Sequence, residues 1–138
     1  MKIRVINSRE EISRLNPKER VVHVSFPLTT SALLELAKRC PKLEGIQVPP
    51  SRLAKIWDRS LILLEVLGVR IFEGSIQGYR TDRAEYIIVD DSLILQRAGE
   101  LGAEGLGSEK IVAKVAAEVG VSPGLVGFII GVFRNWHI

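Results

Sequence analysis

The sequence predicts an α/β fold, with a small, mostly parallel sheet and covering helices, followed by a C-terminal three-helix unit of helix-turn-helix type. Short apolar runs alternate with amphipathic helical segments over the first part of the chain, a pattern typical of parallel strands joined by crossover helices. The last third loses this alternation and holds helical segments separated by glycine-containing turns. We therefore divide the chain into an α/β domain, residues 1–89, and a helical unit, residues 90–138.

Strands and helices are expected to alternate from the start of the chain to residue 76. The predicted strands are residues 2–6, 21–26, 43–49 and 69–76, and the predicted helices are residues 10–15, 29–40 and 51–67. In the second of these helices, Leu33, Leu36 and Cys40 share one face at helical spacing. On the long helix, the residues expected to face the interior are Leu53, Ile56, Trp57, Ser60, Leu64 and Leu67.

The pattern changes after Gly78, where the chain becomes polar before one more expected strand, residues 85–90, at an edge of the sheet. Asp90 and Asp91 favour the start of a helix that runs to residues 102–107. Ser108 is expected to cap the next helix. Ser122 and Pro123 are the preferred cap and first-turn residue of the last one.

Length and composition are those of an ordinary globular protein. The 138 residues, of which 46% are hydrophobic and 25% charged, suffice for a self-sustaining core. A single cysteine excludes an intrachain disulfide, and two histidines offer too few ligands for a zinc site, so we expect no metal and no cofactor. No secretory signal is recognised, and the longest uncharged run, residues 119–133, is shorter than the roughly 20 residues that span a bilayer. We expect a cytoplasmic protein without membrane contact.

The C-terminal segment, residues 115–136, has the pattern of a helix-turn-helix without the side chains that read DNA. Ala116 and Gly120 fall where that motif requires a small residue and a turn glycine. The outward positions of the second helix normally carry residues that hydrogen-bond base edges. Here they carry Gly124, Gly127, Phe128 and Gly131.

These glycines predict close packing. Each glycine in a helix interior costs about 1 kcal/mol relative to alanine, so a compensating contact is expected. Gly124, Gly127 and Gly131 are spaced to share one face, beside Phe128, and small residues let another backbone approach closely. The partner is expected to be a second copy of the chain or the α/β domain. The alternative is that this helix is simply the buried centre of the helical unit.

Four segments carry a resemblance to a known family: KIRVI, RCPKLEGIQVP, RIFEGSIQGYRTD and EKIVAKVAAEVGVSPGLV. In this order, they resemble a family of short archaeal proteins, largely from methanogens, catalogued as a domain of unknown function. The resemblance implies an archaeal, cytoplasmic protein and supplies no activity. Separately, EGLGSEKIVAKVAAEVGVSPGLV is similar to the helix-turn-helix of resolvase-like DNA-binding proteins.

Topology predicts an anion site. In open parallel sheets, ligands bind beyond the carboxyl ends of the strands, where helix N-termini and loops converge. The candidate anion-binding residues in these loops are Thr29, Thr30, Ser51, Arg52, Arg80 and Arg83. The same hydroxyls also suit simple helix caps, and the arginines a solvated turn.

A basic stripe on the predicted long helix is the candidate for nucleic-acid phosphates. Arg52, Lys55 and Arg59 recur at helical spacing. The structural alternative is a solvated helix face. No catalytic constellation is recognised: His23 lies in an apolar strand and Cys40 on an apolar helix face, where a packed imidazole and a packed thiol are expected.

The sequence thus favours a non-enzymatic regulatory or nucleic-acid-associated protein with a C-terminal interaction helix, meeting DNA or RNA through phosphates. A net charge of +3 permits this role without requiring it. One alternative is a small sensor or enzyme that binds an anionic metabolite at the strand ends. The other is a protein-interaction subunit, including a homo-oligomer.

Overall fold

A five-stranded sheet forms the centre of the protein in the computed structural model, which describes residues 1–76 and 85–131. The strand order is β4-β3-β2-β1-β5. The four parallel strands are β1 (Lys2–Ile6), β2 (Val21–Val24), β3 (Gly45–Val48) and β4 (Arg70–Glu73), and β5 (Tyr86–Ile88) pairs with β1 in antiparallel orientation at one edge. The predicted α/β class is confirmed, as is the predicted edge position of the last strand.

The first face of the sheet is covered by the segments that connect the parallel strands. These are the 3-10 helix η1 (Arg9–Arg14), α1 (Thr30–Arg39), α2 (Pro50–Leu53) and α3 (Asp58–Leu67). Their apolar side chains meet those of alternate strand residues in one core, which includes Ile6, Leu33, Leu36, Ile46 and Leu64. Cys40 is buried in this core, and burial raises the pKa of its thiol.

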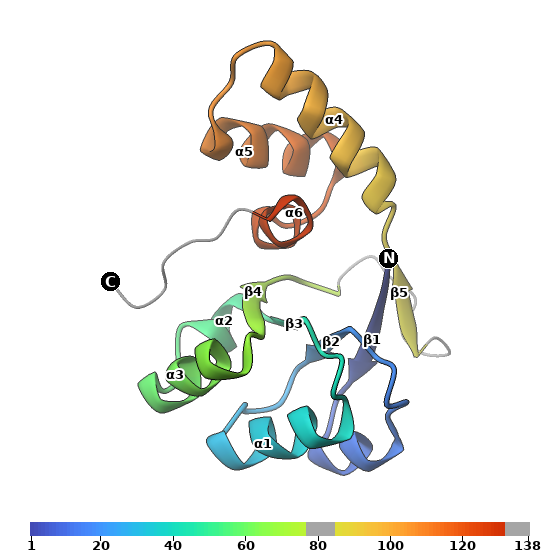
Figure 1. The fold of residues 1–138 in the computed structure, drawn as a ribbon, viewed down its shortest axis with the longest axis vertical. Coiled ribbons are helices and arrows are strands. Elements are labelled where there is room, and N and C mark those ends of the chain that lie inside the picture. The colour runs from blue at the N-terminus through green and yellow to red at the C-terminus, as the bar shows by residue number, and fades with distance from the viewer. Residues whose placement is uncertain (77–84, 132–138) are drawn as a thin grey trace.

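The second face is covered by α4 (Asp91–Ala103), α5 (Ser108–Val119) and α6 (Pro123–Ile130). Figure 1 shows these helices on the side of the sheet opposite α1 and α3, with α6 between the sheet and the other two, so the sheet is the middle one of three layers and each outer layer is a group of helices. A second core joins sheet and helices, and includes Ile3, Phe72, Ile94, Leu101 and Val126. The sheet therefore serves two cores, because strand side chains alternate between its faces.

The prediction of one long helix over residues 51–67 is wrong. The chain leaves the helical conformation after α2, and Trp57, with φ −77° and ψ 146°, is the extended residue that precedes α3. This break changes the orientation of the second segment, so that Ser60 and Leu64 face the core. Trp57 is 60% exposed and Leu67, in the last turn before Gly68, is 39% exposed, which corrects their predicted inward positions.

The helix ends of the C-terminal unit agree with the sequence at one cap and differ at another. Ser122 caps α6 as predicted, because its side chain accepts a hydrogen bond from the backbone N–H of Leu125. Ser108 does not cap α5: Gly107 takes that position and Ser108 is the first helical residue. Gly131 is also not an interior residue of α6, since it ends the helix with φ +79°. The three glycines therefore do not form one continuous helical face.

Within the described residues, no single helix has the length and apolar composition needed to cross a membrane. The pair formed by α5 and α6 meets these criteria only when taken together, and it is bent by 119°.

Candidate functional site

The carboxyl ends of β2 and β3 open into a small cleft of about 80 Å³, which we call the strand-end cleft. Its described lining residues are Pro27, Leu28, Thr29, Val48, Arg52, Lys55, Ile56, Trp57 and Ile71. The cleft brings together Thr29 and Arg52 of the predicted anion site and Lys55 of the basic stripe. It does not include Thr30, which begins α1, Ser51 of α2 or Arg59 of α3. Arg80 and Arg83 lie outside the described residues.

The local backbone explains how these side chains converge. Pro49 and Pro50 follow β3 directly and begin the short helix α2, which carries Arg52. The guanidinium of Arg52 is anchored across the cleft, because its Nε donates to the backbone oxygen of Ser25, 3.3 Å away, just after β2. The hydroxyl of Thr29 accepts from the N–H of Ala32 at 3.2 Å and so caps α1.

The strand-end cleft is cationic and has an exposed aromatic side chain at its border. Among its described lining residues, Arg52 and Lys55 are charged and none is acidic. The Nη groups of Arg52 and the Nζ of Lys55 make no hydrogen bond or ion pair with the described part of the chain. Trp57, in the extended break between α2 and α3, exposes 60% of its surface. This combination suits an anionic ligand that also presents a flat ring.

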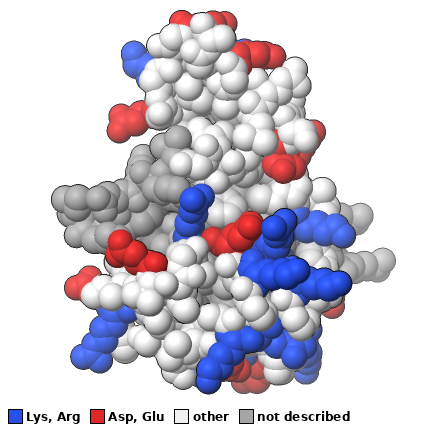
Figure 2. Space-filling model, viewed as in Figure 1, with Lys and Arg blue, Asp and Glu red and all other residues white. Residues whose placement is uncertain are grey.

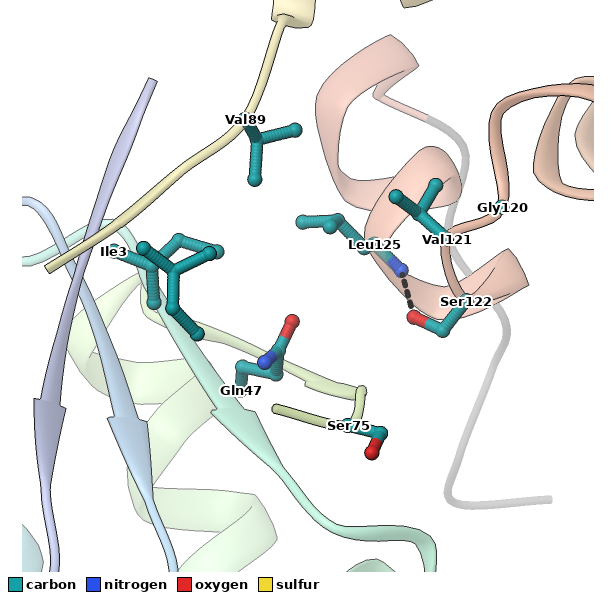
Figure 3. A pocket seen from close by; sticks show the side chains of 9 residues that line it. Ile3, Gln47, Ser75, Val89, Gly120, Val121, Ser122 and Leu125 are labelled. Carbon is teal, nitrogen blue, oxygen red and sulfur yellow. Dashed lines mark hydrogen bonds between the residues drawn. The ribbon is translucent and has the colours of Figure 1, made fainter. Parts of the chain in front are cut away.

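A second and larger cavity lies between the sheet and the turn that joins α5 to α6 (Figure 3). We call this cavity, of about 280 Å³, the interlayer cavity. Its described lining residues are Ile3, Gln47, Ser75, Ile87, Val89, Gly120, Val121, Ser122 and Leu125. Sequence reasoning did not predict it, because its wall combines residues of three strands, Ile3, Gln47 and Ile87, with the turn at residues 120–122, and these segments are far apart in the sequence.

Gln47, in this wall, forms a buried polar pair with His23. The two residues are direct neighbours in the register of β2 and β3, and their side chains are 2% and 1% exposed. Gln47 Nε2 lies 2.8 Å from His23 Nδ1, while His23 Nε2 has no hydrogen-bond partner among the described residues. Burial lowers the pKa of His23 to about 4, so the ring is neutral at pH 7. Aligning the predicted strands by their ends, residues 26 and 49, would have placed His23 opposite Ile46, so this pair follows only from the register of the structure.

The residues predicted as a helix interface lie at different places on α6. A Cβ on Gly124 would be 2.6 Å from the backbone oxygen of Glu73 in β4, so this glycine permits close contact with the sheet. The ring of Phe128 stacks on Phe72 with centroids 4.6 Å apart, and Gly127 is buried. The hydroxyl of Ser122 also donates to the backbone oxygen of Glu73 at 2.9 Å. Within the chain, α6 thus packs on the sheet at Gly124 and Phe128 and also contacts α4 and α5.

Two observations concern the residues that could take part in metal or acid–base chemistry. In residues 1–76 and 85–131, no three His, Cys, Asp or Glu side chains are grouped so that they could hold a metal ion. His23 is buried against Gln47 and does not line either cavity.

These features define a three-layer α/β protein with a basic cleft at its strand ends and a second sheet face covered by three C-terminal helices. The chain belongs to the family of unknown function DUF1699, because the model of that family's N-terminal domain matches residues 2–85. No curated protein and no solved structure matches the chain. The family match ends close to residue 89, but the two-domain division stays a prediction.

Proposed function

We propose that this protein is a non-enzymatic, nucleic-acid-associated protein that holds single-stranded nucleic acid at the strand-end cleft. Arg52 and Lys55 contact phosphates, and Trp57 provides a surface on which one base stacks. The observation that carries the proposal is the position of Trp57, 60% exposed beside two cationic side chains in one cleft. Arg59 adds an exposed cation in the first turn of α3, beyond the break at Trp57 that separates it from Arg52 and Lys55, so the three residues do not form the expected stripe on one helix.

The chemistry of the strand-end cleft favours a single strand over a duplex. Proteins that hold single strands combine cationic side chains along the phosphates with aromatic rings that stack on bases. A duplex keeps its base faces covered, so an exposed indole gains nothing from it. Single-strand stacking of this kind is tolerant of sequence, and we expect binding without base-specific recognition.

The packing of α6 argues against DNA reading by the C-terminal helices. The turn of residues 120–122 and the 119° bend between α5 and α6 support a relationship to helix-turn-helix units, whose helices meet at about 90–120°. However, the face of α6 with Gly124 and Phe128 is turned to the sheet. The segment 90–131 also carries six acidic and three basic residues. In Figure 2, most Lys and Arg on the visible face lie over the α/β part, below the helical unit.

An archaeal, cytoplasmic setting is part of the same proposal, and it rests on the resemblance of the sequence segments. A regulatory role is proposed with it and does not rest on that resemblance. The first alternative is a sensor of an anionic metabolite in the same cleft, favoured by its small volume and its place beside the N-terminus of α1. The second is a protein-interaction subunit or homo-oligomer. Ile62 and Val66 favour it, because they are 61% and 77% exposed and lie one turn apart on α3.

Fluorescence anisotropy with a labelled oligouridylate and a labelled oligothymidylate tests the proposal. Affinity should fall steeply with salt, and the slope of log K against log [salt] should shrink by roughly 0.7 for each phosphate that Arg52→Gln or Lys55→Gln leaves without its cation. Trp57→Ala should weaken binding by about five- to hundredfold, the range expected for one stacked base. Lys110→Gln, which removes an exposed cation from α5, is the matched control and should leave affinity unchanged.

Two outcomes contradict the proposal. One is the absence of oligonucleotide binding at low salt, and the other is an equal loss of affinity in Lys110→Gln and Lys55→Gln. If a nucleoside monophosphate competes as strongly per molecule as the oligonucleotide, the metabolite alternative is correct.

A further inference from the structure

We infer that the interlayer cavity binds a small, uncharged and largely apolar molecule that donates one hydrogen bond to the side-chain oxygen of Gln47. This site is separate from the strand-end cleft and does not depend on nucleic-acid binding. Four features of the described residues support it: the size of the cavity, the chemistry of its wall, the fixed orientation of Gln47 and the glycine that preserves that orientation.

The size of the cavity indicates a ligand larger than one six-membered ring. An apolar cavity of about 150 Å³ in another protein stays dry and binds benzene. The interlayer cavity, at about 280 Å³, is nearly twice as large and is partly open to solvent. A compact bicyclic molecule is therefore of suitable size.

The described part of the wall suits an uncharged ligand. Five side chains are aliphatic: Ile3, Ile87, Val89, Val121 and Leu125. No charged residue is among the described lining residues, and a charge buried without a partner is strongly unfavourable. The hydroxyl of Ser122 already donates to Glu73 and accepts from Leu125. Figure 3 shows the hydroxyl of Ser75 pointing away from the cavity.

Gln47 is the polar group that faces the space. Figure 3 shows its side-chain oxygen pointing between Ile3 and Leu125, with the nitrogen turned away. That nitrogen donates to Nδ1 of His23 at 2.8 Å, which requires the ring proton to be on Nε2. With the amide as the structure has it, the contact with His23 occupies the nitrogen, so that an acceptor faces the cavity. A ligand N–H or O–H satisfies this acceptor.

Gly74 preserves this orientation. A Cβ at this position would lie 2.2 Å from the amide carbon and oxygen of Gln47, so any larger residue would displace the amide. Strand pairing and helix packing leave Gln47 only 2% exposed, yet its oxygen faces the interlayer cavity. A mostly apolar pocket with a few placed polar groups is the usual construction of a small-ligand site.

A pair of isosteric probes tests the inference on the full chain. Indole has one N–H donor, and benzofuran has an oxygen in its place. We expect indole to bind more tightly by roughly three- to tenfold, the effect of one neutral hydrogen bond. The amide resonances of Val121 and Leu125 should shift in a two-dimensional NMR titration.

Two sets of variants separate ligand recognition from folding. Gln47→Met should remove the preference for indole, and the double variant His23→Leu/Gln47→Met should do the same while restoring an apolar interior. Val121→Phe should fill the cavity and abolish binding of both probes. Ile62→Phe adds the same ring at an exposed position of α3 and is the matched control, with unchanged binding.

The inference is overturned if neither probe binds up to its solubility limit. It is also overturned if the shifts occur around Trp57, or if the two folded Gln47 variants keep the preference for indole. None of these results bears on oligonucleotide affinity, so this site and the strand-end cleft are tested independently.

Discussion

Replacing Gly124 with alanine places a methyl group directly against β4. The new Cβ would lie 2.6 Å from the backbone oxygen of Glu73, 2.8 Å from its Cγ and 3.0 Å from its nitrogen. Two of these atoms are backbone in a paired strand, so α6 has to move away from the sheet. That movement loosens both the stacking of Phe128 on Phe72 and the hydrogen bond from Ser122 to Glu73.

Two opposing terms decide the sign of the effect. Alanine gains up to about 1 kcal/mol in helix propensity, and less in the first turn, where Gly124 lies. Overpacking against a rigid neighbour typically costs about 1–3 kcal/mol. We expect a net loss of about 1–2 kcal/mol in the free energy of unfolding, and a fall in Tm of roughly 3–8 °C for a chain of this size.

Urea unfolding followed by circular dichroism, together with calorimetry, measures this difference. Gly99→Ala is the matched control, because Gly99 is an exposed helix residue of α4 with no heavy atom within 4 Å of its ideal Cβ. That variant should gain up to about 1 kcal/mol. If Gly124→Ala is stabilised as much as Gly99→Ala, α6 does not pack on β4 and the three-layer arrangement is refuted.

Three further predictions concern other buried groups. Because burial lowers the pKa of His23 from 6.5 to about 4, the neutral ring is required for folding: stability should be complete above pH 6.5 and fall by up to about 3 kcal/mol as the pH drops to 4. His23→Leu should show a smaller loss over this pH range in parallel thermal melts, and equal losses would contradict the assignment. Ser122→Ala should lower the free energy of unfolding in urea by about 1–2 kcal/mol, since it removes a helix cap and a hydrogen bond to β4. Ser108→Ala should change it by no more than about 0.5 kcal/mol, because Ser108 does not cap α5. Similar values for both variants would be inconsistent with the caps described. Cys40 should react with a thiol reagent only on unfolding, and fast labelling of the native protein would show that it is not buried.

The order of strands and helices could be predicted from the sequence because each element has its own periodicity. Apolar runs of four or five residues marked the parallel strands, and spacing of three and four residues marked α1. The break between α2 and α3 could not be predicted in this way. Trp57 continues the helical spacing of apolar residues, and only packing against the first core shows that the chain turns there.

The candidate sites depended on tertiary structure to different degrees. Thr29 and Arg52 were predictable, because the carboxyl ends of parallel strands meet at one edge of a sheet. The pair of His23 and Gln47 was not, since it requires the register between β2 and β3. The glycines of α6 indicated close contact, but the chain pattern alone does not say whether the neighbour is a sheet, a helix or another molecule.

The region matched by the family's N-terminal domain model stops at residue 85, but the packing does not stop there. One side of its sheet, with Ile3, Val21 and Phe72, is shielded from water by helices that come later in the chain. On its own, the matched region would leave this apolar side of the sheet exposed to solvent. In this chain, that side is closed by side chains of α4, α5 and α6, which lie outside the matched region.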